Sequence, residues 1–522
     1  MKNNSHYNSN SNCNRVLILD FGSQYTRLIA RRVREQHVYS EIVPFHISID
    51  KIKSDPPGAI ILSGGPSSVY AKNAPRVHMD ILNTGIPLLG ICYGLQLIAY
   101  LSKMEVEPAS GREYGLANLE ILKKSKLLAD VENFSNVWMS HGDKITEYPE
   151  DYVVTGKTKN TTIAVLESKK RNIFGVQFHP EVVHTTEGKK ILGNFLFHIA
   201  RLKPDWNMGN FVRTSTARIR EKVGKEKVIL GLSGGVDSTV LALLLKKAVG
   251  DQLVPVFIDN GLLRKNEYND LMARFKNKLK LNVIGIDASK QFLENLENVR
   301  SPERKRKIIG KTFIDVFRSA QEKTGKVKFF AQGTLYPDVI ESVSVNGPSA
   351  TIKSHHNVGG LPKKMHWQLI EPFRELFKDE VREIGRELGL EEEYIMRHPF
   401  PGPGLAVRVP GSITKERLEV LKEADAILIE ELHHFDIYNK VWQAFVVLLP
   451  VKSVGVMGDL RTYENVAAIR LVESVDGMTA DWYPAPPEFL KKVANRIVNE
   501  VKGINRVVYD LTSKPPGTIE WE

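Results

Sequence analysis

Residues Lys227 to Thr239 read KVILGLSGGVDST, and this stretch decides how the middle of the chain folds. Its apolar run is typical of a buried strand, its glycine pair of a tight turn, and the residues after the turn of a helix. Backbone amides, serine and threonine hydroxyls and a helix N-terminus would then surround one small volume. Because such an arrangement attracts anions, we expect a phosphate-like ligand at this turn.

The turn lacks the G-x-x-x-x-G-K-[ST] spacing of the loop that grips a β/γ-phosphate for γ-transfer. It resembles the PP-loop of the ATP pyrophosphatase family, whose members split ATP between the α- and β-phosphates and adenylylate a substrate oxygen. In this turn Asp237 is placed to hold Mg²⁺, an ion that prefers hard oxygen ligands. The expected ATP and pyrophosphate site is the run Ser233, Gly234, Gly235, Val236, Asp237, Ser238 and Thr239.

Composition indicates a soluble, multidomain protein. A chain of 522 residues predicts three or four units, and we find no apolar run long enough to span a bilayer. Its two cysteines, Cys13 and Cys92, make a disulfide framework implausible and favour the cytoplasm. Residues 1–14 are rich in Asn and Ser and lack the apolar core of a signal peptide, so we expect a disordered leader.

The net charge of +11 admits polynucleotides and small phosphorylated metabolites as partners, and it does not choose between them. The densest basic cluster, Arg304 to Lys307, carries no interleaved aromatic residues. We interpret this cluster as a solvated helix face.

The order of patterns predicts two doubly wound α/β domains and a smaller α+β domain at the C-terminus. From Arg15 strand-like and helix-like segments alternate, and a second such series follows the linker-like stretch RLKPDWNMGN. The Pro- and Gly-rich stretch HPFPGPGLAVRVPG marks the next boundary. We predict domains over residues 15–203, 204–397 and 398–522.

A second set of reactive residues lies in the first domain. Cys92 stands where a buried strand turns into a helix in LLGICYGLQ, an elbow that exposes a nucleophile to a helix N-terminus. Downstream, GVQFHPEV supplies His179 and Glu181 as base and orienting acid. The SGGP segment offers the amide of Gly65, and Tyr93 offers another, for an oxyanion hole.

These residues resemble those of the class I glutamine amidotransferase family over about Arg15 to Leu202. The resemblance implies that glutamine is hydrolysed through a thioester with the catalytic triad Cys92, His179 and Glu181. His141 also fits a family motif near the glutamine pocket, and a packed histidine explains it equally well.

A glutaminase and an ATP pyrophosphatase in one chain imply that a carbonyl oxygen is replaced by an amine. The combination, with IDNG, GTLYPDVIES, HPFPGPGLAVR and SKPPGTIEWE, resembles the family of glutamine-dependent enzymes that aminate XMP to GMP. This resemblance implies ATP as co-substrate, an adenyl-XMP intermediate, AMP and pyrophosphate as products, and a homodimer that binds neither nucleic acid nor membrane.

Further site residues follow from this resemblance. Asp259, Phe313 and Lys378 are expected at the ATP site, although Phe313 also fits a core position and Lys378 a charged helix face. The residues expected to bind XMP are Arg306, Asp338, Glu341, Pro401, Gly402, Lys514, Thr518, Ile519 and Glu520.

A PP-loop enzyme that modifies tRNA is the alternative, because the chain is basic. That function predicts sulfur-handling cysteines near the PP-loop or a polynucleotide-binding appendage, and it leaves Cys92 without a role. Both cysteines lie within the first 92 residues.

Overall fold

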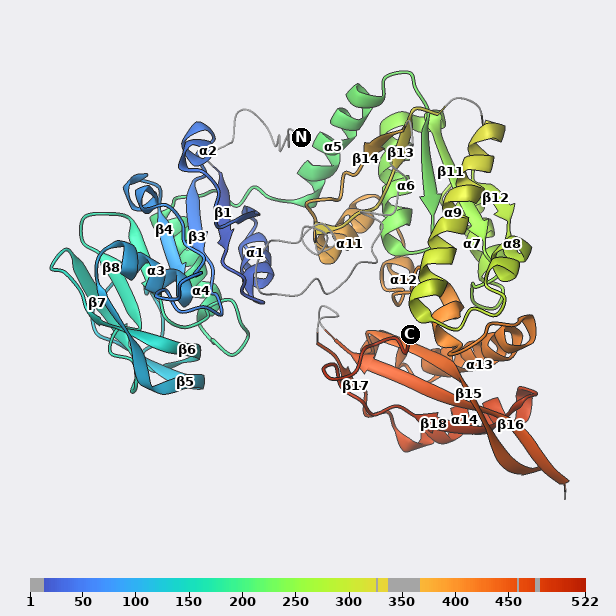
Figure 1. The fold of residues 1–522 in the computed structure, drawn as a ribbon. Helices are drawn as coiled ribbons and strands as arrows, with labels where there is room; N and C mark the ends of the chain where they lie inside the picture. Colours follow the sequence, from blue (N-terminus) through green and yellow to red (C-terminus); the bar gives the residue numbers. More distant parts are fainter. Residues whose placement is uncertain (1–13, 325–326, 337–366, 458–459, 475–478) are drawn as a thin grey trace. The chain divides into compact units, whose positions relative to one another are not determined.

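The computed structural model describes residues 14–324, 327–336, 367–457, 460–474 and 479–522 (Figure 1). These residues divide into two compact units, with the division between Asn210 and Phe211. The leader proposed over residues 1–14 lies outside the described residues except for its last member, Asn14. Within the described part of the chain, no helix has both the length and the apolar character needed to cross a membrane.

The first unit contains a nine-stranded sheet in the order β2-β1-β3-β4-β9-β8-β7-β5-β6. Its first five strands in that order pair in parallel, and the remaining four continue the sheet in antiparallel pairs. The strands are β1 (Arg15–Asp20), β2 (Tyr39–Pro44), β3 (Ala59–Leu62), β4 (Leu88–Ile91), β5 (Glu105–Ile121), β6 (Ser135–Glu147), β7 (Tyr152–Lys157), β8 (Val165–Ser168) and β9 (Ile173–Val176).

The α-helices of this unit are α1 (Thr26–Arg34), α2 (Ile49–Ser54), α3 (Tyr93–Leu101) and α4 (Gly188–Gly193). Strands β3, β4 and β9 are buried throughout, as their unbroken apolar sequences predict for the middle of a covered sheet. The carboxyl ends of β3 and β4 therefore lie side by side, and this edge positions the SGGP segment beside the elbow.

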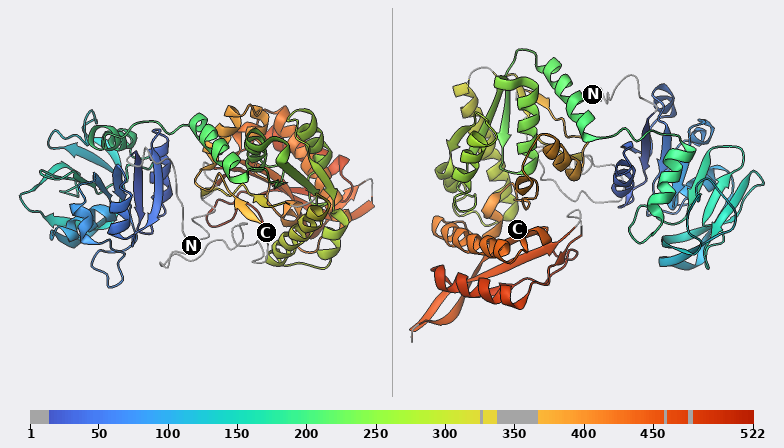
Figure 2. Two further views of the ribbon diagram at one scale, coloured as in Figure 1. Left: turned by 90° about the horizontal axis from the view of Figure 1, so that it is seen from above. Right: turned by 180° about the vertical axis from the view of Figure 1, so that it is seen from behind.

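The second unit begins with a five-stranded parallel sheet in the order β12-β11-β10-β13-β14. Helices lie on both faces of this sheet (Figure 2). Its strands are β10 (Val228–Leu232), β11 (Leu253–Asp259), β12 (Ile284–Asp287), β13 (Phe329–Ala331) and β14 (Gln368–Ile370). Its helices are α5 (Met208–Val223), α6 (Val236–Val249), α7 (Glu267–Asn277), α8 (Ser289–Asn295), α9 (Pro302–Thr324), α11 (Lys378–Glu387) and α12 (Glu392–Ile395).

The rest of this unit is a smaller α+β part in which the long hairpin of β15 and β16 continues into β17 and β18 at the other edge of β16. Helices α13 and α14 pack against each other, α13 on β15 and α14 on β18 (Figure 1). The elements are α13 (Lys415–His434), β15 (Gln443–Met457), β16 (Leu460–Glu473), β17 (Asp481–Trp482), α14 (Pro487–Glu500) and β18 (Ile504–Tyr509).

One hydrophobic cluster joins both parts of the second unit. It extends from Ile229 and Val256 in the parallel sheet through Leu405 to Phe489 in α14. The mixed sheet of the first unit, the parallel sheet and the α+β part together confirm the predicted α/β fold class.

Candidate active sites

Cys92 occupies a strained turn between β4 and α3. Its φ of 51° and ψ of −107° lie outside the regions that non-glycine residues favour, as expected of a nucleophile elbow. Gly94 permits this turn, because a Cβ there would lie 2.3 Å from the backbone carbonyl oxygen of Leu62. The thiol is 4% exposed and donates a hydrogen bond to the carbonyl of Ser140 over 3.4 Å.

His179 and Glu181 lie in the loop after β9, where His179 interacts with Cys92 and Glu181 with His179. The Nδ1 atom of His179 is 2.7 Å from Oε1 of Glu181, and both side chains are buried. Burial alone would lower the pKa of His179, but the Glu181 carboxylate and a hydrogen bond with Cys92 raise it well above its usual value. The arrangement therefore favours an imidazolium next to the sulfur atom.

The glycines after β3 approach these groups closely. A Cβ on Gly64 would lie 3.1 Å from Cε1 of His179, and one on Gly65 would lie 3.3 Å from Cγ of Tyr93. The structure therefore brings the two residues predicted for an oxyanion hole, Gly65 and Tyr93, side by side at the elbow.

His141 belongs to a buried polar cluster beside the elbow. Its Nδ1 lies 2.9 Å from the carbonyl of Asp143, and its Nε2 lies 3.6 Å from the Glu113 carboxylate. Hydroxyls of Thr158 and Thr161 also donate to that carboxylate. Burial lowers the pKa of His141 more than Glu113 raises it, so the ring is held in its neutral form.

In the second unit the PP-loop connects β10 to α6 as the sequence predicts. The hydroxyl oxygens of Ser233 and Ser238 are 3.0 Å apart, and the Thr239 hydroxyl donates to the carbonyl of Gly235. Gly234 has a φ of +77°, a conformation that glycine adopts without strain. The turn thus gathers hydroxyls and amides at the N-terminus of a 14-residue helix.

Basic residues of α11 lie beside this turn. Nζ of Lys378 is 3.9 Å from Oδ2 of Asp237, so the structure brings together two residues predicted for the ATP site. Burial lowers the pKa of Arg382, one turn further along α11, and the nearby charge of Asp237 partly opposes this effect. Arg382 was not among the residues predicted from the sequence. The position of Arg382 one helical turn after Lys378 could have indicated it.

The other residues predicted for ATP lie on different elements. Asp259 ends β11, and one of its carboxylate oxygens accepts a hydrogen bond from the amide of Gly261. Phe313 lies on α9, where its ring packs edge-on against Phe292 in the core.

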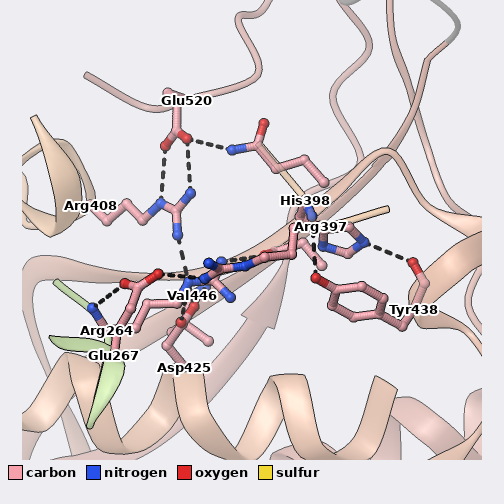
Figure 3. A network of polar contacts seen from close by, with 11 residues as sticks. Arg264, Glu267, Arg397, His398, Arg408, Asp425, Tyr438, Val446 and Glu520 are labelled. Atoms are coloured by element: carbon pink, nitrogen blue, oxygen red, sulfur yellow. Dashed lines mark hydrogen bonds and ion pairs between the residues drawn. The ribbon is translucent and has the colours of Figure 1, made fainter. Parts of the chain in front are cut away.

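Most residues predicted for XMP lie in the C-terminal tail and the Pro- and Gly-rich loop of the second unit. Glu520 forms a bidentate ion pair with Arg408 and accepts a hydrogen bond from Gln443 (Figure 3). Ile519 packs on the small cluster of Phe445 and its neighbours.

The remaining residues of this set lie in the tail, on α9 and in the Pro- and Gly-rich loop. Thr518 offers its carbonyl to Arg470, and Arg306 donates to the carbonyl of Glu522. Pro401 accepts a hydrogen bond from Gly404 at the start of the turn that leads to Arg408, with Gly402 between them. Lys514 pairs with Ala480 as an isolated bridge. Asp338 and Glu341 lie outside the described residues.

The interpretation of Arg304 to Lys307 as a solvated face is wrong for Lys305. Lys305 belongs to α9, and its side chain is fully buried. Its Nζ donates to the carbonyls of Ala406 and Val409 and pairs with Glu522. A lysine reaches this position because the side-chain carboxylate of Glu522 and the backbone carbonyls compensate its charge.

Three family models match the chain. Residues 17–199 match "Glutamine amidotransferase class-I", residues 211–308 match "NAD synthase" and residues 430–521 match "GMP synthase C terminal domain". Together with the two sites, these matches define the class of protein: a glutamine amidotransferase joined to a nucleotide-binding PP-loop part.

Relatives match this chain along nearly its whole length. The "GMP synthase [glutamine-hydrolyzing]" of Brachyspira hyodysenteriae is 58% identical over 98% of this chain and 100% of its own. The protein of the same name from Chlorobium chlorochromatii is 58% identical over 97% of this chain and 99% of its own. The chain belongs to the glutamine-hydrolysing GMP synthase family. It is an enzyme of purine nucleotide biosynthesis with ATP as co-substrate, and these relatives do not favour the alternative of a tRNA-modifying enzyme.

Proposed function

We propose that the chain aminates XMP to GMP with ammonia that its first unit releases from glutamine. ATP adenylylates the purine O2, ammonia displaces the adenylyl group, and AMP and pyrophosphate are the products. The observation that carries this proposal is that one chain holds both a buried Cys-His-Glu arrangement and a hydroxyl-lined PP-loop. Family membership supports the same overall reaction.

At the first site Cys92 is the proposed nucleophile toward the side-chain amide of glutamine. The sulfur bonds to the amide carbon, His179 delivers a proton to the leaving nitrogen, and ammonia departs. Water then cleaves the thioester to give glutamate. The amides of Gly65 and Tyr93 are the proposed donors to the oxyanion, and their close approach at the elbow supports this role.

At the second site the PP-loop is proposed to bind the two outer phosphates of ATP through its amides and hydroxyls. Lys378 lies within 3.9 Å of Asp237 and brings a positive charge to the developing pyrophosphate. Asp259 and Phe313 remain proposed ATP contacts at the end of β11 and on α9.

Asp237 is the proposed Mg²⁺ ligand. The described residues hold no cluster of three or more His, Cys, Asp or Glu side chains that could bind a metal by themselves. One carboxylate next to a phosphate site fits Mg²⁺, because this ion is commonly held by one or two carboxylates together with substrate phosphates. When bound, the ion would neutralise charge on the phosphates.

XMP is proposed to bind at the C-terminal tail and the loop before Arg408. Pro401 and Gly402 supply backbone groups, and the remaining contacts would come from Arg306, Asp338, Glu341, Lys514, Thr518, Ile519 and Glu520. Buried Arg408 and Arg470 support this assignment, because their hydrogen bonds to the tail fix a segment that carries little regular structure.

We further propose a homodimer, a cytoplasmic location, and domains over residues 15–203, 204–397 and 398–522. The β15–β16 hairpin supports the dimer, because it exposes large apolar side chains over its outer part. Their exposed fractions are 56% for Val451, 49% for Val454, 74% for Val456, 72% for Leu460 and 62% for Tyr463.

The test supplies the full-length enzyme with XMP, ATP, Mg²⁺ and either glutamine or an ammonium salt. We expect GMP, AMP and pyrophosphate in equal amounts from both nitrogen sources. Release of ADP in place of AMP would refute the proposed cleavage of ATP. Failure with XMP but turnover of ATP in the presence of tRNA would favour the alternative function.

A further inference from the structure

Arg397 connects the PP-loop to the rest of the second unit and has no role in the reaction described above. It follows α12, and its guanidinium makes two hydrogen bonds of different kinds. Nη1 donates to the carbonyl oxygen of Gly234 over 2.9 Å. Nη2 donates to Oε1 of Glu267 over 2.6 Å (Figure 3).

Glu267 holds the guanidinium firmly. It is the first residue of α7, its side chain is buried, and its second carboxylate oxygen accepts a hydrogen bond from the backbone amide of Arg264. Both oxygens of a buried carboxylate thus have partners. A charge-assisted contact of this kind is stronger and more directional than a neutral one.

The contact with Gly234 fixes the orientation of one peptide group in the loop. In a trans peptide the carbonyl oxygen and the amide hydrogen of the next residue point in opposite directions. When Arg397 holds the carbonyl of Gly234, the amide of Gly235 therefore points away from Arg397. That amide faces the Ser233 hydroxyl over 3.3 Å, on the side where Ser238 also lies.

Gly234 needs such a constraint. Its φ of +77° belongs to a residue without a side chain, which has several backbone orientations available. If the peptide between Gly234 and Gly235 turned over, a carbonyl oxygen would replace an amide among the groups that face the phosphates. A carbonyl there would repel an anion that the amide attracts.

We propose that Arg397, oriented by Glu267, is a positioning residue that keeps the Gly234–Gly235 peptide in the orientation that binds pyrophosphate. It acts through the loop and does not itself contact ATP. This inference rests on the proposed assignment of Ser233 to Thr239 to the pyrophosphate of ATP.

The experiment compares Arg397→Gln and Arg397→Lys with Arg386→Gln in the full-length enzyme supplied with an ammonium salt. Arg386 is a matched control, since it forms a bidentate ion pair with Glu392 on the surface. The measurements are the KM for ATP, kcat, the thermal midpoint, and inhibition by pyrophosphate and by AMP as separate probes of the two halves of the ATP site.

We expect Arg397→Gln to raise the KM for ATP and the inhibition constant of pyrophosphate together, by about 10-fold. The inhibition constant of AMP should match that of the control, whereas the thermal midpoint should fall because the buried Glu267 loses its charged partner. Arg397→Lys should recover part of the loss, because an ammonium group still reaches one of the two acceptors. Glu267→Gln should show the same selectivity with a smaller effect, about 3-fold.

The proposal would be overturned if Arg397→Gln weakened the binding of pyrophosphate and of AMP equally, or if kcat fell in step with the thermal midpoint. Either result would show that the ion pair has a purely structural role. Ser238→Ala separates this failure from a wrong loop assignment. If Ser238→Ala weakens pyrophosphate binding and Arg397→Gln does not, only the inference about Arg397 fails. If neither does, the assignment of the loop fails as well.

Discussion

Glu181→Gln removes one negative charge from the glutaminase site and leaves the shape of the side chain almost unchanged. In the native chain the Glu181 carboxylate lies 2.7 Å from Nδ1 of His179 in a buried environment. Its charge and the hydrogen bond with Cys92 overcome the effect of burial and raise the pKa of His179. In the variant burial prevails, so the protonated form of His179 becomes scarce.

The size of the effect follows from the distance between the two groups. Two unit charges 2.7 Å apart interact with about 6 kcal/mol at an effective dielectric constant of about 20. If the transition state lost this interaction energy entirely, the reaction would slow by about 10⁴-fold. The carbonyl of the introduced Gln still accepts a hydrogen bond from Nδ1, so we expect a fall in kcat of about 10³-fold for glutamine.

The assay measures GMP formation with glutamine and with an ammonium salt in the same preparation. Only the glutamine-dependent rate should fall. Glu167→Gln is the control, since Glu167 is a buried carboxylate of β8 that accepts hydrogen bonds from Ser125 and Thr155, outside the thiol site. A fall of less than about tenfold with glutamine, or an equal fall with ammonium, would refute the proposed electrostatic role of Glu181.

Four further predictions concern other parts of the molecule. Cys92→Ala should abolish the use of glutamine and preserve synthesis with an ammonium salt, whereas loss of both rates would show that Cys92 is structural. Gly94→Ala should lower the free energy of unfolding of the first unit by more than about 2 kcal/mol in urea titrations, because its Cβ would lie 2.3 Å from a carbonyl oxygen of β3. Gly142→Ala is the control and should leave the free energy of unfolding unchanged, because a Cβ there meets no atom within 4 Å. Arg408→Met removes the ion-pair partner of the part-buried Glu520 and one of the two arginines beside the buried Asp425. It should cost about 3–5 kcal/mol of unfolding free energy, and an unchanged urea midpoint would contradict this. Burial lowers the pKa of His398 to about 4, so between pH 6.5 and pH 4 the unfolded chain takes up a proton that the folded chain does not. The free energy of unfolding should therefore fall by up to about 3 kcal/mol as the pH drops from about 6.5 to about 4. His398→Gln should flatten that pH dependence.

The parts of the fold that the sequence predicts best are those with a local pattern. Strand β10 and helix α6 follow from an apolar run, a glycine turn and a second apolar run. The elbow at Cys92 follows in the same way from small residues between a strand and a helix. Helix α14 was not among our predicted elements, although Pro487 at its start and the spacing of Phe489, Val493 and Ile497 indicate an amphipathic helix.

The single long strand β5 was also missed. The strand extends from Glu105 to Ile121 and pairs with β6 over most of its length. A period-two pattern is weak where both faces of a hairpin carry mixed residues, so its length is set by cross-strand pairing that no local window contains.

The burial of charged residues inside the second unit could not be predicted from the sequence. Lys305 and Arg408 are fully buried, and Asp425 lies on the buried face of α13 beside Arg264 and Arg408. Each of these residues, read alone, is typical of a solvated surface, because burying one charge without a partner is costly. Arg408 pairs with Glu520 and Lys305 with the carbonyl of Ala406, and in both cases the two residues are more than 100 positions apart in the sequence. A charged residue in a core position of an amphipathic helix, such as Asp425, therefore indicates that a partner exists, but only the tertiary structure identifies which one.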